Sequence, residues 1–271
     1  MPVIDMGAAR VTILGSGTCV PSLRRSSCSV LVETGEEKLL LDMGVGTMRR
    51  LLEAGVAIGQ ISHLFFSHLH PDHTGELASF LFASKYPEGN RRQRRLRITA
   101  AEGFMAFYER LEKVYGEWIE LEEGVVDIFE MSGARPDFMQ LDFCDIATFP
   151  MAHTASSIAY RITMPDNTSI VYTGDTDYCK NAIRIAANTD LLICECALPD
   201  EMKVDGHLTP SLAGSIASEA QAKNLVLTHF YPECDGVDIE AQCRKTYDGW
   251  LLCAEDLTRI EISNGRLDLL K

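Results

Sequence analysis

The segment "SHLHPDHTG" (residues 67–75) is dense in side chains that bind metals, in a chain with only 7 histidines. Its candidate ligands are His68, His70, Asp72 and His73. An apolar run at 63–67 predicts a strand that ends on this cluster. On an extended segment His68 and His70 project to one side and can reach one ion, whereas Asp72 and His73 turn away with the following helix and can bind a second. The alternative is a capped helix start, in which Asp72 bonds backbone amides and the histidines are incidental.

Three further candidate ligands lie downstream, each where an apolar strand meets a loop. They are His153 in "MAHTASS", Asp175 in "VYTGDTD" and His229 in "LVLTHFYP". Taken alone, each is more typical of a structural polar group at a strand end. Sites on mixed sheets are built at such positions, so together they can complete the two coordination spheres that the first cluster leaves open.

The order of these motifs, HxHxDH followed by His153, "GDT" and "THF", resembles the metallo-β-lactamase superfamily over nearly the whole chain. The resemblance implies an α/β fold, an αββα sandwich of two mixed β-sheets flanked by helices, with two metals at one edge. By motif, the first metal is held by His68, His70 and His153, the second by Asp72, His73 and His229, and Asp175 bridges both.

The ligand types also bear on the metal. Nitrogen and oxygen ligands without a thiolate favour two Zn2+ ions, with Mn2+, Fe2+ or Ni2+ as alternatives. In the family, flavodiiron relatives carry an acid where His70 stands, so the resemblance favours hydrolytic zinc over redox iron.

His207, in "DGHLTPSLAG", is the remaining candidate for chemistry. Thr209 can cap and Pro210 can start the helix that follows, and the positive end of a helix attracts an oxyanion or a phosphate. A histidine at this place resembles the ribonuclease Z branch, where the matching residue serves phosphodiester cleavage. His207 is therefore expected to stabilise the developing oxyanion or to protonate the leaving oxygen, while Asp72 also handles the proton of the attacking water. The alternative is an ordinary loop histidine.

The resemblance to a tRNA-processing ribonuclease Z is incomplete. Many members carry a tRNA-gripping arm between the positions of His153 and Asp175, which here are only 22 residues apart, and Ala159 stands where the family commonly has glycine. We therefore expect a phosphodiesterase that cleaves a small or single-stranded phosphodiester by a metal-bound hydroxide, with a nucleotide or short RNA as the small anionic substrate. The alternatives are a carboxyl-ester, thioester or lactone hydrolase with the same two metals, and a metal-binding carrier or sensor.

The charge of the chain argues against a general nucleic-acid binder, since a net charge of −14 repels phosphate backbones. A local exception is "NRRQRRLR" (90–97), which is either a solvated loop or a docking patch for an anionic substrate or an acidic partner. Nine cysteines without a CxxC pair indicate reduced, structural thiols, with Cys194 and Cys196 on one face of a strand.

The remaining pattern predicts one domain spanning 1–271, a cytoplasmic homodimer without a signal peptide or a membrane span. Expected strands are 11–14, 29–34, 38–42, 63–67, 96–100, 125–131, 139–149, 157–164, 169–173, 191–196, 224–228, 250–254 and 259–262. Expected helices are 47–54 (with Leu51 and Leu52 buried), 77–85, 102–115, 178–187, 211–222 and 239–247. Asp42 is interpreted either as a carboxylate that supports a ligand histidine or as a helix cap.

Overall fold

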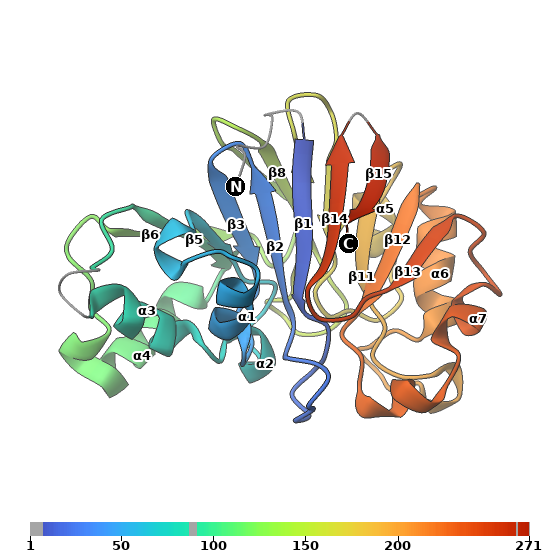
Figure 1. Cartoon of the computed structure of the whole chain (residues 1–271), viewed down its shortest axis with the longest axis horizontal. Helices are drawn as coiled ribbons and strands as arrows, with labels where there is room; N and C mark the ends of the chain where they lie inside the picture. Colours follow the sequence, from blue (N-terminus) through green and yellow to red (C-terminus); the bar gives the residue numbers. More distant parts are fainter. Residues whose placement is uncertain (1–7, 87–90, 264, 271) are drawn as a thin grey trace.

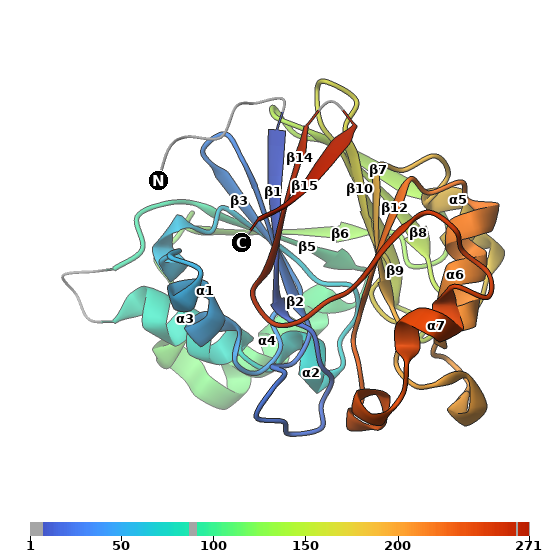
Figure 2. The same cartoon turned by 45° about the vertical axis from the view of Figure 1, so that its right-hand side comes forward.

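A computed structural model describes residues 8–86, 91–263 and 265–270 of the 271-residue chain. Two sheets pack face to face, and helices cover the outer face of each (Figures 1 and 2). This is the predicted αββα sandwich. Among the described residues, no helix combines the length and the apolar character that a bilayer crossing requires.

The first sheet is formed by the N-terminal half of the chain and the two last strands. Its strands are β1 (Ala8–Gly15), β2 (Ser29–Thr34), β3 (Glu37–Leu41), β4 (His63–Phe65), β5 (Leu96–Ala101), β6 (Val126–Met131), β14 (Thr258–Ser263) and β15 (Arg266–Leu270). Their spatial order is β15-β14-β1-β2-β3-β4-β5-β6, and β3 to β6 run parallel to one another.

The second sheet is formed by the C-terminal half. Its strands are β7 (Asp137–Gln140), β8 (Asp145–Pro150), β9 (Ile158–Thr163), β10 (Ser169–Tyr172), β11 (Leu191–Glu195), β12 (Asn224–Thr228) and β13 (Trp250–Cys253). The order is β13-β12-β11-β10-β9-β8-β7, with β10 to β13 parallel. The carboxyl ends of parallel strands meet at one edge of a sheet, where loops can present side chains to a common site.

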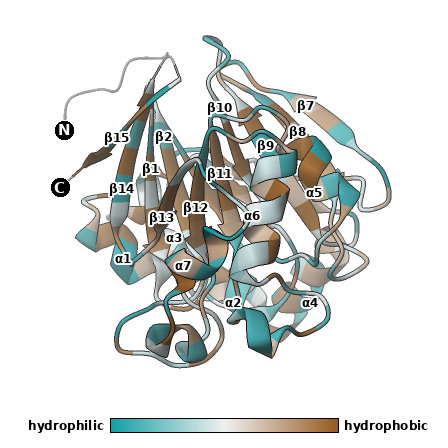
Figure 3. Ribbon diagram, turned by 90° about the vertical axis from the view of Figure 1, so that its right-hand side faces the viewer, coloured by the Kyte–Doolittle hydropathy of each residue, from teal (hydrophilic) through white to brown (hydrophobic). Residues whose placement is uncertain are grey.

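The core lies between the sheets and is apolar on both inner faces. Ile13, Phe65, Tyr160 and Ile193 are among its fully buried members. Figure 3 shows the hydrophobic colouring concentrated in the strands. Burial of such side chains contributes about 1.5–3 kcal/mol each, and this packing holds the strand ends in place.

Helices form the two outer layers. On the first sheet lie α1 (Thr47–Glu53), α3 (Leu77–Lys85) and α4 (Phe104–Tyr115), and on the second α5 (Lys180–Ile185), α6 (Pro210–Glu219) and α7 (Ile239–Cys243). The short helix α2 (Pro71–Thr74) follows β4. Short 3-10 segments lie at Ile58–Gln60, Gly116–Trp118, Asp200–Met202 and Pro232–Gly236.

Several predicted elements are corrected by the structure. The single strand expected at 139–149 is a hairpin of β7 and β8, because the backbone turns between Leu141 and Cys144, whose side chains anchor the turn in the core. Leu52 is 67 % exposed, whereas Thr47 and Leu51 form the buried face of α1. Strand β15 was not predicted, although "NG" at 264–265 is a hairpin signal.

The cysteine interpretation agrees with the structure. All nine thiols are free, and Cys194 and Cys196 are fully buried. Burial raises the pKa values of both thiols. Such thiols pack as small apolar side chains.

The arginine segment, Arg91–Arg97, is in large part the expected loop leading into a strand, since residues 91–95 form a loop before β5 and Arg95 is 66% exposed, whereas the docking patch stays a prediction; Asn90 lies outside the described residues. Arg92 is 4 % exposed and donates to the carbonyl oxygens of Ile58 (2.5 Å) and Ile61 (2.8 Å). The remaining arginines also have partners within the chain: Arg91 with Glu122, Arg94 with Glu37, Arg95 with Asp127, and Arg97 over the ring of Phe129. Through these contacts the segment before β5 is held against the 58–61 turn, the β2–β3 hairpin and β6.

Candidate metal centre

Six of the seven histidines lie together where the carboxyl ends of strands from both sheets meet. His68, His70 and His73 follow β4, His153 follows β8, Asp175 follows β10, His207 precedes α6, and His229 follows β12. The structure therefore brings every predicted site residue into one cluster. All of them except His207 follow a strand end within a few residues, and the buried strand fixes the backbone there.

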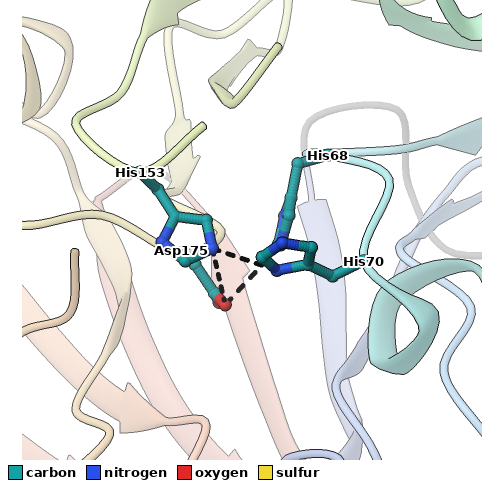
Figure 4. A group of neighbouring side chains, drawn as sticks. All are labelled: His68, His70, His153 and Asp175. Carbon is teal, nitrogen blue, oxygen red and sulfur yellow. Dashed lines mark hydrogen bonds and ion pairs between the residues drawn. The ribbon is translucent and has the colours of Figure 1, made fainter. Parts of the chain in front are cut away.

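One group of ligand atoms consists of His68, His70, His153 and Asp175, which converge from three loops (Figure 4). Asp175 Oδ2 lies 3.7 Å from His68 Nε2 and 3.8 Å from His153 Nε2. His153 Nε2 lies 3.1 Å from His70 Nδ1. These are the four residues that the resemblance assigns to the first metal.

A second group consists of Asp72, His73 and His229, on the other side of the Asp175 carboxylate. Asp175 Oδ1 lies 3.3 Å from His73 Nε2 and 3.2 Å from His229 Nε2. His229 Nε2 is also 3.7 Å from Asp72 Oδ2. One oxygen of Asp175 thus faces each group, which is the arrangement that a bridging carboxylate requires.

The outward nitrogens of three histidines are held by hydrogen bonds. Nδ1 of His73 donates to Asp42 Oδ2 (2.7 Å), and Nδ1 of His153 donates to the carbonyl oxygen of Gly206 (2.9 Å). Nδ1 of His68 contacts the hydroxyl of Ser67 at 3.0 Å. These bonds select the tautomer whose Nε2 lone pair points into the cluster, as in metal-binding histidines generally.

Asp42 supports the ligand histidine His73 and is not a helix cap, the other role considered for it. Its carboxylate accepts hydrogen bonds from the Ser67 amide and hydroxyl and from the Tyr172 hydroxyl (2.6 Å), besides His73. It caps no helix, because α1 begins after Gly46. The role of Tyr172 was not predicted, since a tyrosine inside an apolar strand has the pattern of an ordinary core residue.

The donor set fits divalent cations. For metal–ligand bonds of about 2.0–2.1 Å at tetrahedral angles, ligand atoms lie about 3.4 Å apart. The separations given above are 3.1–3.8 Å, and all the ligand atoms of each group lie within 4.8 Å of one another. Among the described residues, buried His68 Nε2 and Asp175 Oδ1 find no hydrogen-bond partner of good geometry. Other buried polar atoms of the described residues also lack partners, but these two belong to a group whose ligand atoms lie within 4.8 Å of one another, an arrangement that fits a bound cation.

The pKa values of His68 and Asp175 also fit a site for a divalent cation. Burial lowers the pKa of His68 to about 2, so its imidazole is neutral and keeps its lone pair. Burial opposes ionisation of Asp175, but His229 and His73 hold the pKa of that carboxyl well below its usual range. His68 is thus in the neutral form that zinc needs, beside an ionised carboxylate. Burial lowers the pKa of His73, but Asp175 and Asp42 outweigh this and raise that pKa well above its usual value, so His73 would give up a proton on binding a metal.

His207 lies beside the cluster and is held by an acid that was not predicted. Its Nδ1 donates to Glu195 Oε1 (3.0 Å) and lies 3.9 Å from Asp175 Oδ2. Burial lowers the pKa of His207, but the hydrogen bond to Glu195 outweighs this and the net shift is upward. Glu195 also accepts from the backbone amides of Thr176 and Leu208. A lone glutamate within the apolar strand "LLICEC" is the signal that could have identified it.

Helix α6 begins at Pro210, as predicted, but its cap differs. The Thr209 side chain makes no capping hydrogen bond, and Asp200 instead accepts from the amide and hydroxyl of Ser211. The helix start is therefore already neutralised by a carboxylate. His207, rather than the helix, is the donor that remains beside the candidate metal groups.

A pocket opens next to this cluster. It has a volume of about 460 Å³, and its lining includes Pro71 and Asp72, of which Asp72 belongs to the second metal group. Its other walls come from the loop between β1 and β2 and from Val45. Pockets of this size accommodate small organic ligands.

Comparison with known proteins gives a consistent result. A family model described as "Anti-Pycsar protein Apyc1" matches residues 9–246. A ribonuclease Z of Haloferax volcanii is 25% identical over 309 aligned residues, covering 93% of this chain and 95% of that protein.

Two solved structures share the fold. The metallo-beta-lactamase fold protein YhfI from Bacillus subtilis superposes with a TM-score of 0.80 at 23% identity, covering 94% of this chain and 100% of that one. The short form of human tRNase Z gives a TM-score of 0.76 at 24% identity, covering 93% and 98%. The comparisons confirm the predicted metallo-β-lactamase fold, its ribonuclease Z-like branch, and a metal-dependent hydrolase.

Proposed function

Because the chain belongs to the family described as anti-Pycsar protein Apyc1, we propose that it is a metal-dependent phosphodiesterase with two zinc ions and a small phosphodiester substrate. The ribonuclease Z relatives support the phosphodiesterase class. A cyclic nucleotide is the leading substrate candidate, and a short single-stranded RNA is the next.

The observation that carries this proposal is the placement of His207. Its ring lies within 4.8 Å of the His153 ring and 5.6 Å of the His229 ring, measured between centroids, while Glu195 holds its Nδ1. A donor outside the ligand set, beside both metal groups, suits a reaction in which charge develops on a phosphoryl or leaving oxygen.

We propose that the first zinc is held by His68, His70 and His153, the second by Asp72, His73 and His229, and that Asp175 bridges them. Bound in this way, the two ions would supply an activated water and neutralise negative charge on the substrate. The mutual spacing of the ligand atoms and the two-sided contacts of Asp175 support the assignment.

The roles of this chain's residues follow from their surroundings. Burial opposes ionisation of Asp72, but nearby His229 lowers the pKa of its carboxyl to about 2. Asp72 is therefore ionised and can orient the attacking water or accept its proton. His207, held by Glu195, donates a hydrogen bond to the phosphoryl oxygen or a proton to the leaving oxygen.

The pocket beside Asp72 supports a small substrate. Its volume of about 460 Å³ suits a mononucleotide and is far too small for a folded tRNA. The segment between His153 and Asp175 forms only the β9–β10 hairpin, so no tRNA-gripping arm is present there. A net charge of −14 also disfavours long polyanions.

One observation favours the second candidate, a carboxyl-ester, thioester or lactone hydrolase. Among the described residues that line this pocket, Arg25 is the one cation, and it is already engaged: it donates to the Ser16 hydroxyl and the Ala254 carbonyl, and it stacks over Phe230. Val20, Pro21 and Val45 give the pocket apolar walls. Such a pocket would also suit an uncharged acyl substrate.

A substrate panel separates the candidates. The zinc-loaded protein is assayed against bis(p-nitrophenyl) phosphate, 3′,5′-cyclic nucleotides and a short RNA on one side, and against lactones and thioesters on the other. Turnover of the phosphodiesters at least 100-fold faster supports the proposal. Faster turnover of the acyl substrates rejects it in favour of the second candidate. The homodimer, the single domain and the cytoplasmic location stay predictions.

A further inference from the structure

Beyond the ligand set, we infer that Asp177 is a positioning residue, which orients both the ligand His153 and the donor His207 through the 203–207 loop. This inference rests on the proposed metal site. Asp177 follows the bridging Asp175 by two positions, and it belongs to none of the metal groups among the described residues.

The contacts of Asp177 tie three segments of the site together. Its backbone amide donates to the carbonyl of Ala152, the residue before His153 (2.9 Å). Its carboxylate oxygen Oδ2 accepts from the Gly206 amide (2.9 Å) and from Lys203 Nζ (2.8 Å). One residue therefore holds the backbone beside His153 and both ends of the 203–207 loop.

The loop in turn holds the ligand. The carbonyl of Gly206 accepts the hydrogen bond from His153 Nδ1 (2.9 Å), and the next residue in the chain is His207. The path from Asp177 to the imidazole of His153 thus consists of two hydrogen bonds and one glycine. Partners of this kind fix the ring orientation of metal-binding histidines.

The 203–207 loop has little packing of its own to maintain that position. Residues 203–205 are exposed, and Gly206 and His207 are only partly buried. Gly206 adopts φ 85°, and a Cβ at this position would lie 3.1 Å from His153 Nδ1. The loop therefore approaches the histidine so closely that glycine is needed, and hydrogen bonds rather than apolar burial hold it there.

This arrangement predicts an asymmetric effect on the two metals. Without the Asp177 carboxylate, the loop is released and His153 loses its fixed acceptor. The ion held by His68, His70 and His153 should then bind about 10–100-fold more weakly, the range for loss of such a partner. The ion held by Asp72, His73 and His229 should bind as before, since its supports run through Asp42.

Matched variants separate the hydrogen bond from the ion pair. Asp177→Ala removes both. Asp177→Asn keeps an amide oxygen that can accept from Gly206, and Lys203→Met removes the ion pair together with the exposed bond from Lys203 Nζ to the Val204 carbonyl. Gly206→Ala acts on His153 from the other side, by pressing a methyl group toward its ring. We expect Asp177→Ala and Gly206→Ala to weaken one ion, and the other two variants to stay within about 3-fold of the wild-type affinity.

The test is competition between each purified protein and a chromophoric zinc chelator, with thermal unfolding of the metal-free proteins recorded to verify folding. The wild type should bind two ions, and Asp177→Ala should show one weakened by 10–100-fold and one unchanged. Two unchanged ions in Asp177→Ala would overturn the inference, as would equal weakening of both ions. Absence of two-ion binding in the wild type would instead reject the proposed metal site itself, and this inference with it.

Discussion

Two segments of the chain concentrate unusual side chains, and they differ in what surrounds those side chains. The histidine segment 68–73 leaves a buried imidazole nitrogen without a partner and faces an equally unsatisfied carboxylate oxygen of Asp175. The arginine segment 91–97 has carboxylates, carbonyls or an aromatic ring beside its arginines, although the Nε atoms of Arg92 and Arg97 also lack a hydrogen-bond partner. Neither the density of one residue type nor an unpaired polar atom alone marks a functional site; the histidine segment is set apart because its ligand atoms and those of other loops lie within 4.8 Å of one another.

The two segments also occupy opposite ends of the parallel strands. Residues 68–73 follow the carboxyl end of β4, whereas residues 91–97 precede and begin β5, its parallel neighbour. The seventh histidine, His63, starts β4 and so lies at the arginine end, beside Arg94 and Arg97. It provides an internal comparison for the six histidines at the metal edge.

The largest effect is expected from Asp175→Ala. Because each oxygen of this carboxylate faces a different metal group, its loss should release both ions and abolish turnover. Elemental analysis of the purified variant measures this directly. Asp190→Asn is the control, since Asp190 is also buried but bonds Ser169 and Lys223 away from the site. Two ions retained by Asp175→Ala would contradict the bridging role and weaken the contrast between the segments.

The next effect is expected from His207→Ala, which leaves every proposed ligand intact. Both ions should remain, while kcat for a substrate with a poor leaving group should fall about 10²–10⁴-fold. The loss should be smaller for p-nitrophenyl substrates, whose leaving oxygen scarcely needs a proton. Kinetics on both substrates measure the difference. Equal losses would assign His207 to oxyanion stabilisation, and no loss on either would make it an ordinary loop histidine.

The sequence predicted this site better than its surroundings. The residues that project from strand ends are dictated by metal chemistry, which permits few side-chain types, so His153, Asp175 and His229 stand out. Glu195 and Asp177 were missed because a carboxylate that bonds backbone amides has no motif of its own. Their roles depend on which loops the fold brings together.

Among the helices and strands, too, those that follow from a local pattern were predicted, and features that depend on distant contacts were missed. Strand and helix periodicities gave the layers correctly, because alternation and amphipathicity follow directly from burial. The β7–β8 turn was missed because apolar residues continue through it. The burial of Arg92 was not predicted, because the carbonyl oxygens that it bonds belong to the 58–61 segment. Such partners are distant in sequence, so no local pattern predicts them.

His63, the histidine at the arginine end of the strands, should make the stability of the fold depend on pH. Burial lowers its pKa from 6.5 to about 4, so the unfolded chain binds a proton here before the folded chain does. Stability should therefore fall as the pH drops from about 6.5 toward 4, by up to about 3 kcal/mol at this residue. His63→Phe keeps a ring against Phe65 and Phe143 and removes the titration.

The measurement is urea unfolding of zinc-saturated wild type and His63→Phe at pH 7 and pH 5. The variant should lose less stability between the two values. Equal losses would mean that His63 takes up its proton as readily in the folded chain as in the unfolded chain. Its imidazole would then not be a buried neutral group.

The smallest effects are expected within the arginine segment, and they should be structural. Arg92→Met removes the bonds to two backbone carbonyls and leaves those oxygens without their donor. The cost should be about 1–3 kcal/mol of unfolding free energy, with metal content and kcat unchanged. Arg95→Ala is the matched control, because its side chain is 66% exposed and its pair with Asp127 lies at the surface.

For Arg95→Ala we expect a change in unfolding free energy within about 0.5 kcal/mol, since exposed ion pairs gain little in water and are screened by salt. Urea unfolding and phosphodiesterase kinetics are measured on both variants at low and high salt. A raised KM for an anionic substrate at low salt, with stability unchanged, would mean that Arg95 attracts the substrate from a distance. The arginine end of the strands would then take part in function, and the contrast between the two segments would fail.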